Sequence, residues 1–487
     1  MPSKNKYFIL CILLLYCGLT TRSQPAGNHS SNHIPDSATI TADTVHKRSF
    51  FIINAIFISG NKKTKAATIE RELPFKKGDS VYLPELVAKF QRSRELLINT
   101  RLFNNVIVSV KSFHGYLADI QIDVTERWYI FPVPYFRPVD RNLSAWADKN
   151  YSLSRVNYGI KFLHSNFTGR NDRLRIWLLT GYTRQLQLNY DQPASDKSLK
   201  HGFGFGVLYA ALKEINISTN NNQQTFINTD SLSNTGKYLF KQATASFNYF
   251  YRPALTTRHI VRLGFSYIQT DGAVAATNPK YFNNGVEKIW YPEISYTLEY
   301  QKVDYTAYVL KGFMGDLNFI HRGFSSNMDL SQFTARFTNG LPLGHRFYLG
   351  FQGYGTVKLP FEQPYFNQRL FGYGDIYLRG LEKYVVDGVA GAMFRSTIRK
   401  KLFSFDISGG RLPSLERIPF AIYAKLFGDM GYAYNKTFTQ NSLVNKMLYT
   451  AGAGIDVVSV YDFIFRCEYS FNQLGQPGLF FHIRNDF

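Results

Sequence analysis

The sequence predicts a transmembrane antiparallel β-barrel of about 16 strands, preceded by one small α+β domain. From Trp128 to Phe487, short runs that alternate apolar and polar residues are separated by Gly, Asn, Asp and Pro. The chain has 42 Phe and 33 Tyr among 487 residues but only 3 Cys, a composition typical of many short strands. Beyond the amino-terminal segment no run of about 18 apolar residues occurs, so we expect no spanning helix.

Residues 1–23 have the layout of a secretory signal peptide. Two lysines precede an apolar segment, residues 7–19, and small and polar residues then lead to a cleavage site near Ser23. Lipidation of Cys17 stays open as an alternative, although the bulky Tyr16 stands where a lipoprotein signal needs a small residue. An exported chain without a spanning helix is either soluble or a membrane barrel.

Residues 24–49 are rich in Ser, Asn, Thr and His, which predicts a flexible spacer without a core of its own. After signal cleavage only Cys467 remains, so we expect no intramolecular disulfide. The formal net charge is +21, and the Lys and Arg residues are scattered through strand-like runs. Because the chain is exported, we expect anionic lipid head groups or a basic lumen to explain this charge, with no nucleic acid as partner.

The small α+β domain is predicted for residues 50–127. Residues 51–59 form an apolar, β-branched strand, and residues 65–73 form a short helix that Thr64 is able to cap. Pro84 opens a second helix, where its missing N–H does no harm. The apolar residues near one face of that helix are Leu86, Val87, Phe90 and Leu97. Two alternating strands follow, around residues 106–110 and 120–124.

Four pieces of this domain occur in an order that resembles a POTRA domain, the periplasmic module of the Omp85 superfamily. They are Ile58–Asn61, Gly78–Asp79, Leu96–Val106 and Val124–Glu126. A generic small α+β domain is the alternative.

The barrel is predicted for residues 128–487. Ile294, Tyr296 and Leu298 face one way, while Glu293 and Glu299 face the other. A soluble sandwich would show the same alternation. Aromatic residues near strand ends and a charged opposite face favour a lipid-facing exterior around a wet lumen. At roughly 20 to 24 residues per strand and turn, this part of the chain predicts about 16 strands.

A loop near residues 371–381 is rich in glycine and aromatic residues and carries a single arginine, Arg379, next to Gly380. We expect the loop to fold into the barrel and Arg379 to pair with Asp429, because a buried charge needs a partner. Asp429 shares its strand face with Lys425, opposite the apolar residues, so it points into the lumen. Glu468 is a second choice of partner, and an exposed arginine on a surface loop is the alternative.

The resemblance to the Omp85 superfamily extends along the barrel. Asn157–Gly159 and Asn166–Arg170 are similar to early barrel strands of the family. Leu378–Leu381 occupies the place of the VRGY/F-type motif of the sixth extracellular loop, and Phe427–Gly431 that of the strand whose aspartate pairs with it. Two departures concern loop contacts: the motif has Leu378 and Leu381 instead of valine and an aromatic, and Thr397 stands where relatives often carry a glutamate.

The first strand, near residues 128–136, and the last, near residues 478–487, are predicted to form the closing seam. Prolines at this seam remove backbone donors, which should weaken it. Phe487 is a terminal aromatic, which by resemblance is part of a barrel-targeting signal. The residues assigned to the seam and the carboxy-terminal signal are Trp128, Pro132, Pro134, Phe481, Ile483 and Phe487.

No catalytic motif is found, and we predict neither an enzyme nor a cofactor or metal site. The run Gly202–Gly206 alternates with phenylalanine and lacks a following helix, so it predicts a strand and not a phosphate-binding loop. The 10 histidines show no metal-binding spacing. Single Ser, His and Asn residues that meet inside the barrel, as in an outer-membrane phospholipase, are the alternative.

The resemblance implies an outer-membrane protein with a periplasmic POTRA domain, acting as an insertase or translocase that helps to assemble other outer-membrane β-barrel proteins. Its partners would be outer-membrane lipids and unfolded outer-membrane protein clients, with periplasmic or lipoprotein accessory factors left open. A pore of the two-partner type that secretes a dedicated protein is the main alternative. A passive structural barrel is a third, but it leaves the POTRA domain without a role.

Overall fold

The computed structural model describes residues 50–138, 150–229, 232, 238–408, 417–436 and 441–484. The predicted signal peptide and spacer, and Phe487, lie outside the described residues. Among the described residues, no helix combines the length and the apolar character needed to cross a bilayer.

The segment from Phe50 to Glu126, the amino-terminal domain, folds as a four-stranded sheet with two helices. The sheet order is β2-β1-β4-β3, with β1 parallel to β4 and the other neighbours antiparallel. Ile69 of the first helix and Leu86 and Leu97 of the second are buried in one core with sheet residues. The elements are β1 (Phe50–Ser59), α1 (Ala66–Glu70), β2 (Ser80–Tyr82), α2 (Leu83–Asn99), β3 (Phe103–His114) and β4 (Leu117–Glu126).

Three details of this domain differ from the sequence predictions. The short edge strand β2 lies between the helices, where no strand was predicted. Thr64 does not cap α1, because its hydroxyl instead bonds the Tyr129 hydroxyl at 3.1 Å and the Asn166 amide at 2.9 Å. Val87 is 65% exposed. Adjacent helical positions lie about 100° apart, so Leu86 takes the side that faces the core.

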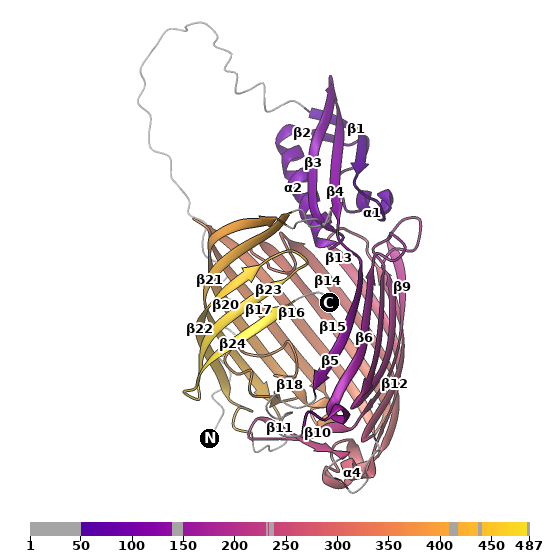
Figure 1. Ribbon diagram of the computed structural model, residues 1–487, viewed down its shortest axis with the longest axis vertical. Coiled ribbons are helices and arrows are strands. Elements are labelled where there is room, and N and C mark those ends of the chain that lie inside the picture. The colour runs from indigo at the N-terminus through magenta and orange to yellow at the C-terminus, as the bar shows by residue number, and fades with distance from the viewer. Residues whose placement is uncertain are drawn as a thin grey trace, which may run out of the picture. The chain divides into compact units, whose positions relative to one another are not determined.

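Sixteen strands form one antiparallel sheet, which confirms the predicted fold class and strand number (Figure 1). Each strand pairs with the next along the chain, as expected for an up-and-down barrel. The strands are β5 (Ile130–Pro138), β6 (Val156–Ser165), β7 (Arg173–Gly181), β8 (Thr183–Gln192), β9 (His201–Leu212), β12 (Phe240–Tyr251), β13 (Thr257–Thr270), β14 (Lys288–Val303), β15 (Gly312–Ser325), β16 (Met328–Gly344), β17 (Phe347–Leu359), β20 (Ala390–Ser408), β21 (Arg417–Tyr434), β22 (Met447–Val458), β23 (Ile464–Asn472) and β24 (Pro477–Arg484).

The two faces of the sheet differ in chemistry, as the alternation predicted. Leu263 and Phe265 of β13 are exposed on the outer face, which suits contact with lipid. On the inner face charged side chains pair between neighbouring strands: Glu293 with Arg322 at 2.5 Å, for example. The outer face would be an aggregation surface in water, so the sheet is built for a bilayer.

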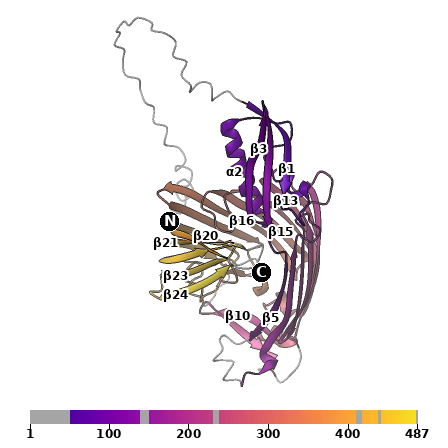
Figure 2. The same ribbon diagram turned by 45° about the horizontal axis from the view of Figure 1, so that its top comes forward.

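The connections at the two ends of the barrel have different roles. Turns at one end contact the amino-terminal domain, and the longer connections lie at the other end (Figures 1 and 2). The sixth long-end connection, residues 360–389, joins β17 to β20. The small elements in the long-end connections are η2 (Leu153–Arg155), β10 (Glu214–Asn220), β11 (Gln223–Asn228), α4 (Gly272–Thr277), η4 (Asn283–Gly285), η5 (Tyr365–Asn367), β18 (Arg369–Phe371) and β19 (Val386–Asp387).

The run Asn166–Arg170, quoted above for its family resemblance, forms the turn between β6 and β7 instead of a strand. Asn166 donates to Thr64, and the Gly169 carbonyl accepts from the Thr68 hydroxyl at 3.1 Å and the Lys65 N–H at 3.0 Å. A Cβ at Gly169 would lie 2.4 Å from the Lys63 carbonyl oxygen, so only glycine allows this close approach. The turn therefore anchors the amino-terminal domain to the barrel.

Candidate functional site: an inward loop and an unpaired seam

The connection between β17 and β20 lies against the inner faces of β20 to β23. Its Leu378 and Leu381 are buried in an apolar cluster with Met393 of β20 and Leu448 of β22. The two leucines that depart from the family motif thus fill apolar space against the barrel wall. We name residues 378–381 together with Asp429 the loop lock.

Arg379 is the central residue of the loop lock. Its Nε donates to Asp429 Oδ2 at 2.9 Å, and its Nη2 bonds Asp429 Oδ1. The Arg379 backbone N–H adds a third bond to Asp429 at 3.0 Å. Nη1 donates to the Thr397 hydroxyl at 3.0 Å, and the guanidinium lies 4.0 Å from the ring centre of Phe427. This is the bidentate geometry in which arginine binds a carboxylate best.

Both charges of this pair are buried, since Arg379 is 7% and Asp429 4% exposed. A second cation, Arg395 of β20, has its Nε 3.8 Å from the same carboxylate and its guanidinium 4.7 Å from the ring centre of Tyr377. Removing Asp429 would therefore leave two arginines without their shared anion, which is far costlier than losing an exposed ion pair.

Gly380 makes the direction of Arg379 possible. Its φ of +93° is rarely adopted by other residues, and a Cβ there would lie 3.0 Å from the Ser470 Cβ. Its N–H donates to Glu382 at 2.6 Å, and its carbonyl accepts from Asn472 at 2.8 Å. The loop is thus fixed to β23 immediately beyond the arginine.

Glu468, the second-choice partner of Arg379, bonds a different cation in the structure. Its Oε1 lies 2.5 Å from Lys425 Nζ, and the same ammonium group bonds Asp456. Asp456 also accepts from the Tyr308 hydroxyl at 2.8 Å. A buried lysine with two carboxylates ties β21, β22 and β23 together beneath the loop lock.

A cavity of about 1200 Å³ lies inside the barrel next to the loop. Its lining is mostly polar and charged, as a wet lumen requires. Lining residues that belong to the loop and its surroundings are Asp375, Tyr377, Glu382, Arg395, Arg466 and His482.

The first and last strands of the barrel, β5 and β24, are the two ends of the sixteen-stranded sheet. Among the described residues, no backbone pairing joins them. Their ribbons are separate in both views (Figures 1 and 2). We name these facing edges of β5 and β24 the seam.

The prolines of β5 lie on the free side of that strand. The Ser165 N–H donates to the Tyr129 carbonyl, so odd-numbered residues of β5 bond to β6 and even-numbered ones direct their backbone groups to the seam. Pro132 and Pro134 are among these even-numbered residues, and Pro138 completes the set. Three of the five seam-facing positions in β5 therefore have no N–H to donate.

The other assigned seam residues lie on the outer face or at the strand start. Phe481 and Ile483 of β24 are exposed at 61% and 64%, in positions that face lipid. Trp128 precedes β5 and is also exposed. The backbone N–H of Trp128 donates to the Tyr461 hydroxyl at 3.1 Å, and Tyr461 lies on the other side of the seam, in the turn between β22 and β23.

Side chains bridge the seam at the end near the amino-terminal domain. Arg127 Nη1 lies 3.2 Å from Asp462 in the turn between β22 and β23, and Arg101 lies 3.4 Å from the same carboxylate. The Tyr305 hydroxyl also bonds Asp462. Burial alone would raise the pKa of Asp462, but the charge of Arg127 lowers it overall. We name Asp462 and its partners the seam latch.

A second buried ion pair connects the amino-terminal domain to the barrel. Glu72 Oε1 lies 2.6 Å from Arg252 Nη1, in the turn after β12. Burial opposes ionisation of Glu72, yet the charges of Arg252 and Arg71 lower its pKa to about 2. The glutamate therefore stays ionised and paired throughout the physiological range.

Sequence reasoning missed the seam latch, the Lys425 network and the Glu72–Arg252 pair. Each joins residues more than 30 positions apart through side chains that single-strand alternation marks only as polar. Strand parity does place Lys425 and Asp456 on the inner face. It does not say which inner residues of neighbouring strands lie level with one another.

Residues 51–127 match the family model POTRA, described as surface antigen variable number repeat. No curated protein sequence matches the chain. Among solved structures, CdiB from Escherichia coli is similar with a TM-score of 0.50 and 12% identity, covering 89% of this chain and 75% of that one. BamA from Haemophilus ducreyi lacking POTRA domains 1-3 is similar with a TM-score of 0.46 and 15% identity, covering 89% and 83%.

At 12% identity the likeness to CdiB establishes a shared fold. The POTRA match covers the same residues as the amino-terminal domain, and the sixteen-stranded sheet with an apolar outer face follows it directly. The fold expected from the sequence is confirmed: residues 51–127 match a POTRA domain, and the chain shares the fold of CdiB, a small α+β domain followed by a sixteen-stranded antiparallel sheet.

Proposed function

We propose that this protein inserts other β-barrel proteins into the outer membrane by opening its seam and offering a strand edge to the client. The observation that carries the proposal is the absence of backbone pairing between β5 and β24 in the described residues. An unpaired strand edge is a template for another strand, because its free N–H and C=O groups can continue the sheet. The proposal needs no catalytic chemistry.

The two edges of the seam are not equivalent as templates. The free side of β5 has lost three donors to proline, while β24 carries no proline after its first residue, Pro477. An incoming strand would therefore make a more complete set of hydrogen bonds with β24 than with β5. We infer that β24 is the edge that receives the client.

The POTRA domain offers a further edge outside the barrel. Its sheet ends at β3, a strand of 12 residues, on the side opposite the short β2. An extended client segment could add to this edge in the same manner before it reaches the seam. This supports a role for unfolded outer-membrane proteins as partners.

Export through the lumen, as in two-partner secretion, is the second candidate, and the fold likeness to CdiB is compatible with it. That route requires the inward loop to leave the lumen, which would break the Arg379–Asp429 pair. Losing one side of a buried ion pair costs about 3 to 5 kcal/mol. Opening the seam breaks no described strand pairing between β5 and β24 and disturbs only contacts near the amino-terminal domain, such as the seam latch, which favours the lateral route.

Covalent closure of the seam tests the proposal. Pro134→Cys and Phe481→Cys, in a Cys467→Ser background, place thiols near the middle of β5 and β24 for crosslinking with bismaleimides of increasing length. We expect closure to abolish insertion of a model barrel into vesicles containing the purified protein. A matched control joins Leu263→Cys to Ile294→Cys, which already face each other in paired strands β13 and β14.

Full insertion by the closed-seam protein would refute lateral opening. Depletion in cells, followed by an outer-membrane proteome, separates the two candidates. A general loss of barrel proteins supports the insertase, whereas loss of one exported protein with an intact proteome supports the secretion pore.

A further inference from the structure

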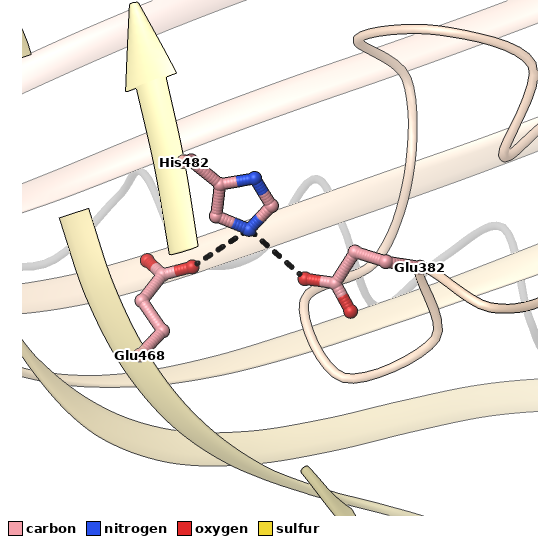
Figure 3. Close-up of side chains that lie close together, drawn as sticks. All are labelled: Glu382, Glu468 and His482. Atoms are coloured by element: carbon pink, nitrogen blue, oxygen red, sulfur yellow. Dashed lines mark ion pairs between the residues drawn. The ribbon is translucent and has the colours of Figure 1, made fainter. Parts of the chain in front are cut away.

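Three side chains from three different elements converge beside the loop lock: Glu382 of the loop, Glu468 of β23 and His482 of β24 (Figure 3). His482 Nε2 lies 3.4 Å from Glu382 Oε1 and 3.6 Å from Glu468 Oε2. The three ligand atoms all lie within 4.8 Å of one another. Glu382 and His482 are 100 positions apart in the sequence, so only the fold unites the three residues.

Each residue is held by other contacts and aims one further polar atom at the common point. Glu468 Oε1 bonds Lys425, and Glu382 Oε2 accepts the Gly380 N–H. The remaining atoms, His482 Nε2, Glu382 Oε1 and Glu468 Oε2, are buried and make no hydrogen bond among the described residues. Glu468 is only 2% exposed. A buried polar atom without a hydrogen bond is costly, so an ion bound at this point would stabilise all three.

The donor set indicates which group fits. One imidazole and two carboxylates are ligands that Zn²⁺ and related divalent transition ions accept. Zinc ligands lie about 2.1 Å from the ion, and at tetrahedral angles they are then roughly 3.4 Å apart. The observed 3.4 and 3.6 Å agree with this spacing. Calcium and magnesium require six or more oxygen ligands, so this site suits them poorly.

The surroundings also suit a metal site. His482 Nδ1 lies 3.4 Å from the Tyr377 hydroxyl, and the two rings stack with centroids 5.4 Å apart. A contact on the second ring nitrogen orients a histidine ligand. Glu382 and His482 line the lumen cavity, which provides a path of entry for an ion. Asp456 also pairs with Lys425 and partly neutralises its positive charge, which limits the repulsion between Lys425 and a bound cation.

We propose that Glu382, Glu468 and His482 bind a divalent transition ion of the zinc class, and that the ion ties the inward loop to the last strand of the barrel. The ion links the loop to β24, the strand that borders the seam. This goes beyond the proposed function, because binding of the ion requires no client and no insertion.

The test uses the purified full-length protein in detergent and zinc chloride as the probe. We expect titration calorimetry to give one zinc per chain, with the affinity reduced at least about tenfold in His482→Gln and in Glu382→Gln. His259→Gln is the matched control, because this half-buried histidine of β13 contacts only the Tyr296 hydroxyl and neighbouring rings in the described structure. Glu468 is not substituted, because its loss would leave the buried Lys425 without one of its two carboxylate partners.

Cobalt provides an independent measurement. Tetrahedral Co²⁺ absorbs in the visible range, so the wild type and the His259→Gln variant should develop this band while the two ligand variants should not. Zinc should also raise the unfolding temperature of the wild type and not that of His482→Gln, because an ion bound only to the folded state stabilises it. No zinc binding, or binding with equal affinity in the ligand variants, would overturn the site.

Discussion

The loop lock and the seam belong to the same barrel but are held in opposite ways. At the lock, all three guanidinium nitrogens of Arg379 are hydrogen-bonded, and its carboxylate partner is buried. At the seam, the described residues of β5 and β24 share no backbone pairing, and Arg127 and Trp128, just before β5, contact Asp462 and Tyr461 in the turn between β22 and β23. Buried charge thus fixes residues 378–381, a segment without helix or strand, while missing donors leave two regular strands free to separate.

Breaking the lock should have the largest effect. Asp429→Ala leaves Arg379 and Arg395 buried without their anion, and we expect a loss of about 3 to 5 kcal/mol in the free energy of unfolding. Urea unfolding of the barrel in detergent, followed by tryptophan fluorescence, measures it. Lys436→Ala, which breaks an exposed pair with Glu362, is the control and should leave unfolding unchanged.

Exchanging the two charges refines this experiment. The double variant Arg379→Asp with Asp429→Arg should recover part of the stability or activity that either single change removes. Purely additive losses would show that the two residues act independently and would contradict the lock.

The Glu72–Arg252 ion pair between the POTRA domain and the barrel is a third buried charge contact, and its strength depends on pH. The pKa of Glu72 is about 2 in the folded protein, below its ordinary value of 4.5. The pair therefore contributes fully above pH 4.5, and its contribution of roughly 3 kcal/mol is lost as the pH falls towards 2. Spin labels on α2 and on the turn after β12 should report the POTRA domain separating in acid.

Glu72→Gln is the control for that measurement, because an amide carries no titrating charge. The variant should show a weakened contact at neutral pH and a much smaller change in acid. An acid response as large as that of the wild type would assign the transition to other groups.

The seam latch should have an intermediate effect. Asp462→Ala removes the anion that Arg127 and Arg101 share, and a hydrogen bond to a charged group is worth about 1.5 to 3 kcal/mol. We expect the distribution of distances between spin labels on β5 and β24 to broaden and to shift towards larger values. Asp406→Ala, at an exposed position of β20, should leave the distribution unchanged.

Restoring donors to β5 should have the smallest effect and the opposite sign. Pro132→Thr and Pro134→Thr return two N–H groups to the free side of the strand, each able to contribute about 1 kcal/mol if β24 pairs with it. Stability should rise slightly and insertion activity should fall. Unchanged insertion with a demonstrably paired seam would argue that the prolines do not govern opening.

Strand alternation in the sequence was sufficient for the barrel, its strand number and the inner orientation of Asp429, because a period of two residues assigns each side chain to a face. Arg379 was singled out by a different signal, its place beside Gly380 in a loop rich in glycine and aromatic residues, since an arginine carried inward on a loop requires an anion. Local patterns were less reliable where a side chain could bond either its own segment or a distant one. The Thr64 hydroxyl, for example, bonds Tyr129 and Asn166 instead of capping a helix.

The amino-acid order by itself therefore determined the two-part architecture, the lipid-facing stripes and the sequence motif of the inward loop. Only the tertiary structure decided which inner residues lie level across different strands: Asp462 with Arg127, Lys425 with Asp456 and Glu468, and His482 with Glu382. The physical reason is that alternation specifies the face of a strand but not its height against its neighbours. Height depends on strand tilt and register, which the arrangement of all sixteen strands sets together.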